Sequence, residues 1–177
     1  VAFRNIIKTK YILEVLYMDG WSRKKWILVY VLAVVLGTLF HFVYGFTGEN
    51  RIVGYFFPIN ESTWEHMKLV YFPMLLCMWI FVKSADEKWM LGNIIGTWLI
   101  PVMFYTYKGI LGFGVMAIDI LNFYIAVFAA FRFAYHFAGS VWNKASAVVI
   151  RVLFIIQGIM FVVFTYHPLT LGIFAEP

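Results

Sequence analysis

The chain has 177 residues, of which 63% are hydrophobic and 13% charged, whereas charged residues make up about 25% of an ordinary soluble domain. This composition excludes a water-soluble globular fold, because a chain of this length cannot bury so much apolar surface in its own core. The formal charge of +5 does not indicate a nucleic-acid partner, since the basic residues flank apolar segments. We expect an all-α, polytopic membrane helical bundle whose surroundings are the lipid bilayer.

Residues 1–25 combine basic and apolar side chains. Phe3 and Leu16 can share a broad apolar face of a helix, opposite Arg4 and Lys8. The segment is too short and too charged to cross a bilayer. We predict a basic amphipathic helix that lies on the membrane surface, and a basic, partly ordered tail is the alternative.

Residues 26–177 are predicted to form a transmembrane domain of about five helices. A span needs about 20 mainly apolar residues. In chain order, the windows that satisfy this requirement cover about residues 26–46, 64–82, 89–107, 110–133 and 147–166. Gly92 and Gly96, in the third window, form a small-xxx-small pattern that permits close helix packing.

Lys and Arg residues are distributed unevenly between the two ends of this bundle. The end where the first window finishes receives only Arg51, Lys68 and Lys108, and the opposite end receives the other eleven of the fourteen. The positive-inside rule therefore places the N-terminus in the cytoplasm and the C-terminus outside an inner (plasma) membrane.

The most informative stretch, residues 60–68, begins the second window from the outside. Glu61, Glu65 and His66 offer two carboxylates and an imidazole, which are enough for metal ligation or proton transfer. The alternative is structural, because Ser62 and Glu65 match a capping box and the helix dipole favours acids at a helix N-terminus.

Asp119 is predicted to lie about nine residues inside the fourth window, where a carboxylate costs several kcal/mol unless it is protonated, paired or hydrated. The alternative to a functional role is a protonated Asp119 that hydrogen-bonds to a neighbouring helix. Asn122 falls on the same face, and His41 falls near the outer end of the first window. We predict a substrate or ion site formed by Glu61, Glu65, His66, Asp119 and Asn122. These side chains suggest a divalent metal as a cofactor, with His41, His66 and Asp119 as its ligands, and haem ligation by two of the outer histidines is a remoter alternative.

Two stretches of the sequence resemble a known family. They are His41-Phe-Val-Tyr-Gly-Phe-Thr-Gly-Glu-Asn50 and Pro58-Ile-Asn-Glu-Ser-Thr-Trp-Glu-His66. Through them, residues 26–177 are similar to small bacterial membrane proteins described only as a domain of unknown function. The resemblance implies a multi-span helical fold and brings no activity, substrate or cofactor.

Three classes of function are compatible with these features. We predict an outward-facing polar cavity that binds or transports an ion, a proton or a small polar solute, in a homo-oligomer, because five spans are few for a transporter with paired repeats. The second class is a membrane-embedded metal-dependent hydrolase in which Glu61 or Glu65 activates a metal-bound water, although no HExxH or GxSxG motif supports it. The third is a non-catalytic protein that packs against a membrane partner. Whether the protein is an enzyme is left open.

Overall fold

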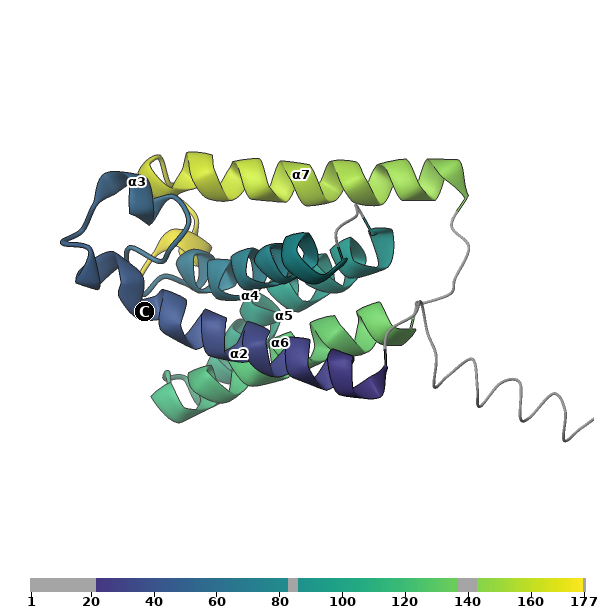
Figure 1. The fold of residues 1–177 in the computed structure, drawn as a ribbon. Helices are drawn as coiled ribbons and strands as arrows, with labels where there is room; N and C mark the ends of the chain where they lie inside the picture. Colours follow the sequence, from purple (N-terminus) through teal and green to yellow (C-terminus); the bar gives the residue numbers. More distant parts are fainter. Residues whose placement is uncertain (1–21, 83–85, 137–142, 177) are drawn as a thin grey trace, which may run out of the picture.

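The computed structural model describes residues 22–82, 86–136 and 143–176, and helices dominate this part of the chain (Figure 1). The basic segment of residues 1–25 falls outside the described residues apart from its last four, and the surface-lying helix predicted within it, at about residues 3–18, falls wholly outside them. Arg23 already begins the first long helix, because the Ser22 hydroxyl accepts a hydrogen bond from the Lys25 N–H group at 3.3 Å and caps the helix.

Five helices are long and apolar enough to cross a membrane, as predicted. They are α2 (Arg23–Phe46), α4 (Thr63–Cys77) with its π-helical continuation η1 (Met78–Val82), α5 (Glu87–Leu111), α6 (Met116–His136) and α7 (Lys144–Tyr166). The short α3 (Arg51–Gly54) precedes α4, and the 3-10 turn η2 (Gly172–Phe174) follows α7. The described residues contain no strand, so the all-α class is confirmed for them.

The predicted start of the fourth window, at about residue 110, is too early. Its first residues belong to α5, which continues to Leu111 and ends at Gly112, and α6 begins only at Met116. Gly112 has φ 78° and its N–H group bonds to the Lys108 carbonyl oxygen, a left-handed cap that glycine adopts at little cost. Apolar composition does not reveal this break, because residues on both sides of it are hydrophobic.

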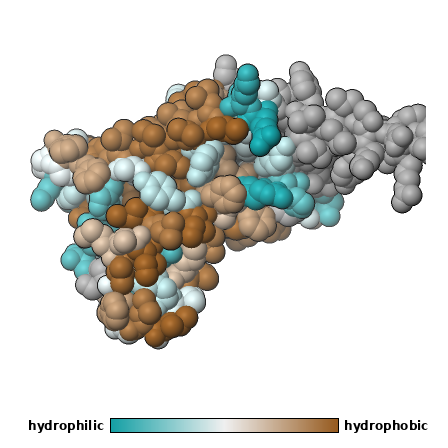
Figure 2. Space-filling model, turned by 90° about the horizontal axis from the view of Figure 1, so that it is seen from below, coloured by the Kyte–Doolittle hydropathy of each residue, from teal (hydrophilic) through white to brown (hydrophobic). Residues whose placement is uncertain are grey.

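Helix α4 forms the centre of the bundle. Of its spanning window 56% is buried inside the protein, against 17–28% for the other four. It lies between α7 and α2 and also packs against α5 (Figure 1). Large apolar side chains cover much of the outside (Figure 2), for example Leu28, Phe128 and Ile155, as expected where lipid surrounds a bundle.

The contact between α2 and α4 depends on one narrow seam. Val29, Ala33 and Gly37 are the buried residues of α2, and His41 continues their spacing of four residues. A Cβ atom at Gly37 would lie only 2.6 Å from the backbone oxygen of Leu69 in α4. The seam therefore brings the next turn of α2, with His41, close to the beginning of α4.

The two ends of the bundle differ in charge. One end contains α3, the beginning of α4 and the last turns of α2 and α7, and we call it the α3 end. Arg23, Lys24, Lys25, Lys88 and Lys144 lie at the opposite end, where α2, α5 and α7 begin.

Candidate metal site

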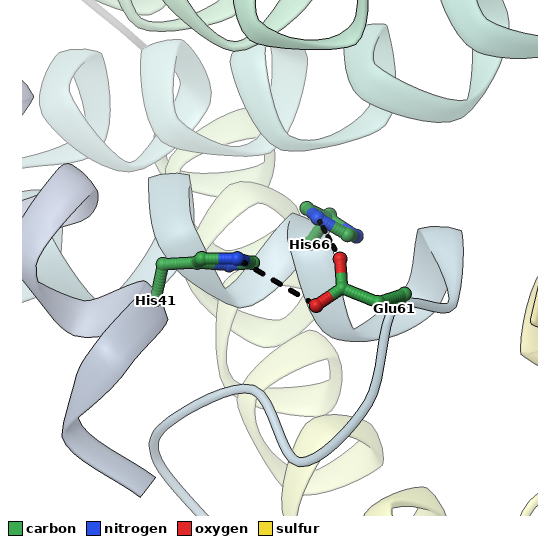
Figure 3. Close-up of side chains that lie close together, drawn as sticks. All are labelled: His41, Glu61 and His66. Atoms are coloured by element: carbon green, nitrogen blue, oxygen red, sulfur yellow. Dashed lines mark ion pairs between the residues drawn. The ribbon is translucent and has the colours of Figure 1, made fainter. Parts of the chain in front are cut away.

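Three side chains from different parts of the chain meet at the α3 end (Figure 3). Glu61, in the loop before α4, lies between His41 of α2 and His66 of α4. Its Oε1 atom is 3.6 Å from His41 Nε2, and its Oε2 atom is 3.4 Å from His66 Nε2. One ligand atom from each residue lies within 4.8 Å of the others. We call this group the His–Glu–His cluster.

A tight turn and a helix cap place Glu61 and His66 in the cluster. The Asn60 side-chain oxygen accepts a hydrogen bond from the Ser62 N–H group at 3.0 Å, which turns the chain at Glu61. The Ser62 hydroxyl then accepts from the Glu65 N–H group at 3.3 Å and caps α4. Glu61 therefore precedes the helix, while His66 lies on its first turn.

The orientation of His66 suits a metal ligand. His66 Nδ1 lies 3.0 Å from the Ser62 carbonyl oxygen. Because a carbonyl oxygen only accepts hydrogen bonds, Nδ1 carries the hydrogen, and the lone pair of the neutral ring is on Nε2, which faces Glu61. Metal-binding histidines almost always donate their second ring N–H to a carboxylate, a backbone carbonyl or water in this way.

His41 completes the cluster from α2. Its ring centroid is 5.4 Å from that of His66, and its Nδ1 atom is buried with no hydrogen-bond partner in the described part of the chain. The side chains of His41 and His66 are 29% and 31% exposed, and that of Glu61 is 63% exposed. An ion can therefore reach the cluster from the Glu61 side.

The cluster has the composition of a site for a first-row divalent metal. Two imidazoles and one carboxylate bind zinc in known enzymes and leave a coordination position open. Two donor atoms on one ion, each at about 2.1 Å, are at most about 4.2 Å apart. The two nitrogen–oxygen distances, 3.4 and 3.6 Å, are within that limit, but each involves a different oxygen of Glu61. One ligand atom from each of the three residues lies within 4.8 Å of the others, so the side chains must move slightly closer together to hold one ion. The same geometry also suits an ion pair when a histidine is protonated.

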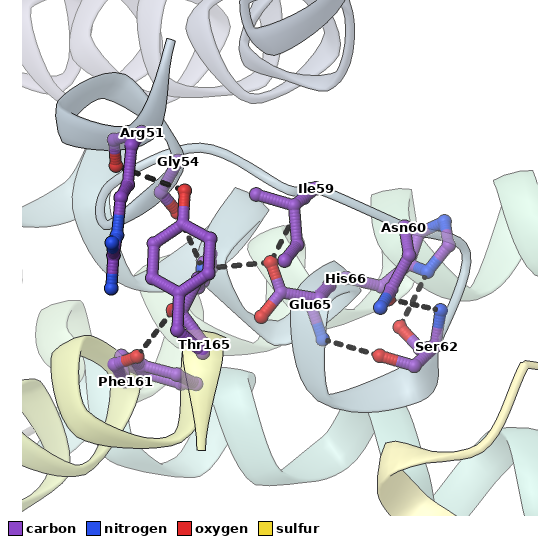
Figure 4. A network of polar contacts seen from close by, with 11 residues as sticks. Arg51, Gly54, Ile59, Asn60, Ser62, Glu65, His66, Phe161 and Thr165 are labelled. Atoms are coloured by element: carbon purple, nitrogen blue, oxygen red, sulfur yellow. Dashed lines mark hydrogen bonds and ion pairs between the residues drawn. The ribbon is translucent and has the colours of Figure 1, made fainter. Parts of the chain in front are cut away.

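Glu65 points away from the cluster and into the bundle (Figure 4). Its side chain is buried, and its Oε2 atom accepts a hydrogen bond from Lys68 Nζ at 2.7 Å. The predicted capping box forms only in part. The Ser62 hydroxyl caps α4, but the Ser62 N–H group bonds to Asn60 and the Glu65 carboxylate accepts hydrogen bonds from Ile59 and Lys68. The predicted site residues Glu61 and Glu65 therefore have different surroundings.

Asp119 lies in a different hydrogen-bonded pair. Because α6 begins at Met116, Asp119 is in the first turn of its helix, and the predicted depth of nine residues is wrong. Its Oδ1 atom accepts a hydrogen bond from the Tyr107 hydroxyl at 2.5 Å. Asn122 is buried one turn further along α6, and its side-chain nitrogen has no hydrogen-bond partner among the described residues. Of the predicted metal ligands, the structure brings together His41 and His66, with Glu61 in place of Asp119.

The sequence showed that Glu61, Glu65 and His66 are sufficient for metal ligation, but the predicted set of metal ligands contained Asp119 and not Glu61. The signal that was present is the Asn60-x-Ser62 turn, which exposes the intervening side chain at the start of α4. No local signal indicated Thr165 of α7, whose hydroxyl oxygen lies 2.7 Å from Lys68 Nζ, because the two residues are 97 positions apart.

Comparison with known proteins places the chain in a family. Residues 16–177 match a family described as a family of unknown function, DUF6512. The chain belongs to this family. The DUF6512 match includes all three residues of the His–Glu–His cluster, and its description names no activity. No curated protein and no solved structure matches the chain.

Proposed function

We propose that this protein binds a divalent transition-metal ion through His41, Glu61 and His66. The observation that carries the proposal is the meeting of two imidazole nitrogens and a carboxylate at 3.4 and 3.6 Å. The hydrogen bond from His66 Nδ1 to the Ser62 carbonyl supports it independently, because it leaves the Nε2 lone pair available to an ion.

The proposed site faces the outside of the cell. The α3 end carries few basic residues, whereas Lys and Arg gather at the opposite end of the described bundle, and the positive-inside rule places such an end in the cytoplasm. The protein thus presents an ion site near the outer surface of the plasma membrane. Uptake or transport of the bound ion, with a homo-oligomer as the working unit, remains part of the proposal.

Ion binding is favoured over metal-dependent hydrolysis. A hydrolase of the predicted type needs a carboxylate that ligates no metal and can take a proton from the bound water. Glu61 lies at ligand distance from both histidines, and Glu65 is occupied by its bond to Lys68. Neither Glu61 nor Glu65, the two carboxylates named as the base, is therefore free to take a proton from a metal-bound water in this geometry.

Titration of purified protein with Zn²⁺ in a mild detergent tests the proposal. We expect one ion per chain, measured by calorimetry and by elemental analysis after gel filtration. Glu61→Gln, His41→Gln and His66→Gln should each weaken binding by more than about 100-fold, since changes of outer partners alone cost 10- to 100-fold.

The control for this titration is His167→Gln, which removes a histidine from the end of α7, outside the cluster. It should bind Zn²⁺ like the unchanged protein. Failure of the unchanged protein to bind, or equal binding by the three cluster variants, would refute the proposal.

A further inference from the structure

Lys68 is fully buried, and its ammonium group is completely paired. Its side chain is 0% exposed, although lysine is among the residues least often found inside proteins. Its three N–H donors find the Gly54 carbonyl at 3.0 Å, Glu65 Oε2 at 2.7 Å and the Thr165 hydroxyl at 2.7 Å. A charge this deep persists only with such partners, and these partners come from three separate segments.

The partners of Lys68 hold the backbone that leads to Glu61. Gly54 is the last residue of α3, so the bond to its carbonyl fixes the start of the loop. Glu65 Oε2, which accepts a hydrogen bond from Lys68, also accepts one from the Ile59 N–H group at 3.0 Å (Figure 4). Ile59 lies two residues before Glu61. Both ends of residues 54–59 are thus attached to the first turns of α4.

Helix α7 strengthens this attachment. The Thr165 hydroxyl donates a hydrogen bond to the Phe161 carbonyl oxygen at 2.6 Å and accepts one from Lys68 Nζ. One residue later, the Tyr166 hydroxyl donates to the Arg51 carbonyl at 2.9 Å, which connects α7 to α3 (Figure 4). The loop is therefore held from α4 and α7 by contacts that need no metal.

We propose that Lys68 and Glu65 are positioning residues that hold Glu61 at ligand distance from the two histidines before an ion binds. This inference rests on the proposed metal site. A loop that is already ordered loses less conformational entropy when it ligates an ion, so preorganisation raises affinity. The pair is neutral as a whole, so its role is to fix the loop and not to attract the ion by charge.

The test replaces both charges at once, by Glu65→Leu with Lys68→Met. Removing one partner alone would leave an unpaired buried charge, whereas apolar side chains of similar volume are often tolerated at buried ion pairs. The first measurement is hydrogen exchange of residues 55–62 by mass spectrometry, without metal. We expect exchange at least about tenfold faster than in the unchanged protein, because the Ile59 amide loses its acceptor. The second measurement is Zn²⁺ affinity, which should fall by about 10- to 100-fold.

Absorption of bound Co²⁺ gives a third readout, since its intensity and shape depend on the number and geometry of the ligands and not on stability. The control variant is Glu87→Gln with Arg151→Met, which removes an ion pair at the opposite end of the bundle. It should leave exchange of residues 55–62, Zn²⁺ affinity and the Co²⁺ spectrum unchanged.

A folded Glu65→Leu/Lys68→Met variant with unchanged exchange would overturn the inference, and so would faster exchange with unchanged Zn²⁺ affinity and Co²⁺ spectrum. If the unchanged protein binds no metal, the proposed function fails, and the exchange measurement still reports whether the pair holds the loop.

If the double variant does not fold, Thr165→Val removes one acceptor of Lys68 and should shift exchange and affinity in the same direction by about two- to threefold. No shift in that variant would count against the proposal.

Discussion

His66 Nδ1 lies 3.0 Å from the carbonyl oxygen of Ser62, the N-cap residue of α4. This bond fixes which ring nitrogen faces Glu61, so the first turn of the helix sets both the position and the tautomer of a proposed metal ligand. The cap that the Ser62 hydroxyl forms with the Glu65 N–H group fixes the same turn. The geometry of the His–Glu–His cluster is therefore largely a property of one helix start, to which α2 adds His41.

Zn²⁺ binding should weaken as the pH falls. A metal binds the imidazole of histidine only in its neutral form, and an imidazole in water takes up a proton between about pH 8 and pH 5. Protons therefore compete with the ion, and the affinity should fall steadily from about pH 7.5 to pH 5.5. Calorimetry at several pH values, in buffers of different ionisation enthalpy, measures both the affinity and the protons released. An affinity that does not change over this range would contradict ligation by the two histidines.

Asp119→Asn should leave Zn²⁺ affinity unchanged within about twofold. Asp119 bonds to the Tyr107 hydroxyl across the turn between α5 and α6, and it joins no group of three potential ligands in the described part of the chain. The substitution should change the free energy of unfolding little, because the amide oxygen of an asparagine can still accept the hydrogen bond from the Tyr107 hydroxyl. Tyr107→Phe removes two hydrogen bonds, the one donated to Asp119 and the one accepted from the Val115 N–H group, and should lower the free energy of unfolding by about 1–2 kcal/mol. Loss of metal binding in Asp119→Asn would show that the cluster lacks a ligand.

Gly96→Val should destabilise the bundle, because α5 and α6 touch at this position. A Cβ atom at Gly96 would lie 2.5 Å from Ala130 Cβ and 2.7 Å from the Ala126 carbonyl oxygen. Overpacking of this kind costs about 1–3 kcal/mol and should lower the melting temperature in detergent. The matched control is Gly109→Ala in the same helix, where an added Cβ meets nothing within 4 Å. The control should be neutral or slightly stabilising, and equal melting temperatures for the two variants would contradict the close packing.

Cysteine labelling tests the orientation in the membrane. In a Cys77→Ala background, Thr47→Cys at the end of α2 should react with a membrane-impermeant maleimide added to intact cells. Ala145→Cys, at the start of α7, should react only after permeabilisation, because it lies at the basic end. The opposite pattern would place the proposed metal site in the cytoplasm. Labelling of both positions from the same side would contradict an odd number of spans between residues 47 and 145.

The sequence alone predicted five helices long and apolar enough to span, the cap at Ser62 and the small-xxx-small pattern of Gly92 and Gly96. Each of these depends on residues within about one or two turns of each other. Apolar length identifies a span, a serine with a glutamate three residues later identifies a cap, and glycines four apart identify a close approach. Gly92 and Gly96 do pack against Ala130, as that pattern predicts.

Four features of the candidate site were not predicted from the sequence, and three of them were decided by tertiary structure. The exception is Asp119, which was placed too deep because the predicted window began at about residue 110, before the left-handed Gly112 that ends α5; this break is local and involves no tertiary contact. Glu61 and Glu65 looked equivalent, yet one meets two histidines and the other meets Lys68. The grouping of His41 with His66 depends on how closely α2 packs on α4 at Gly37, and the burial of Lys68 depends on Thr165 of α7. These contacts join residues far apart in the chain, so local patterns do not encode them, and the packing of helix faces in three dimensions determines which polar side chains meet.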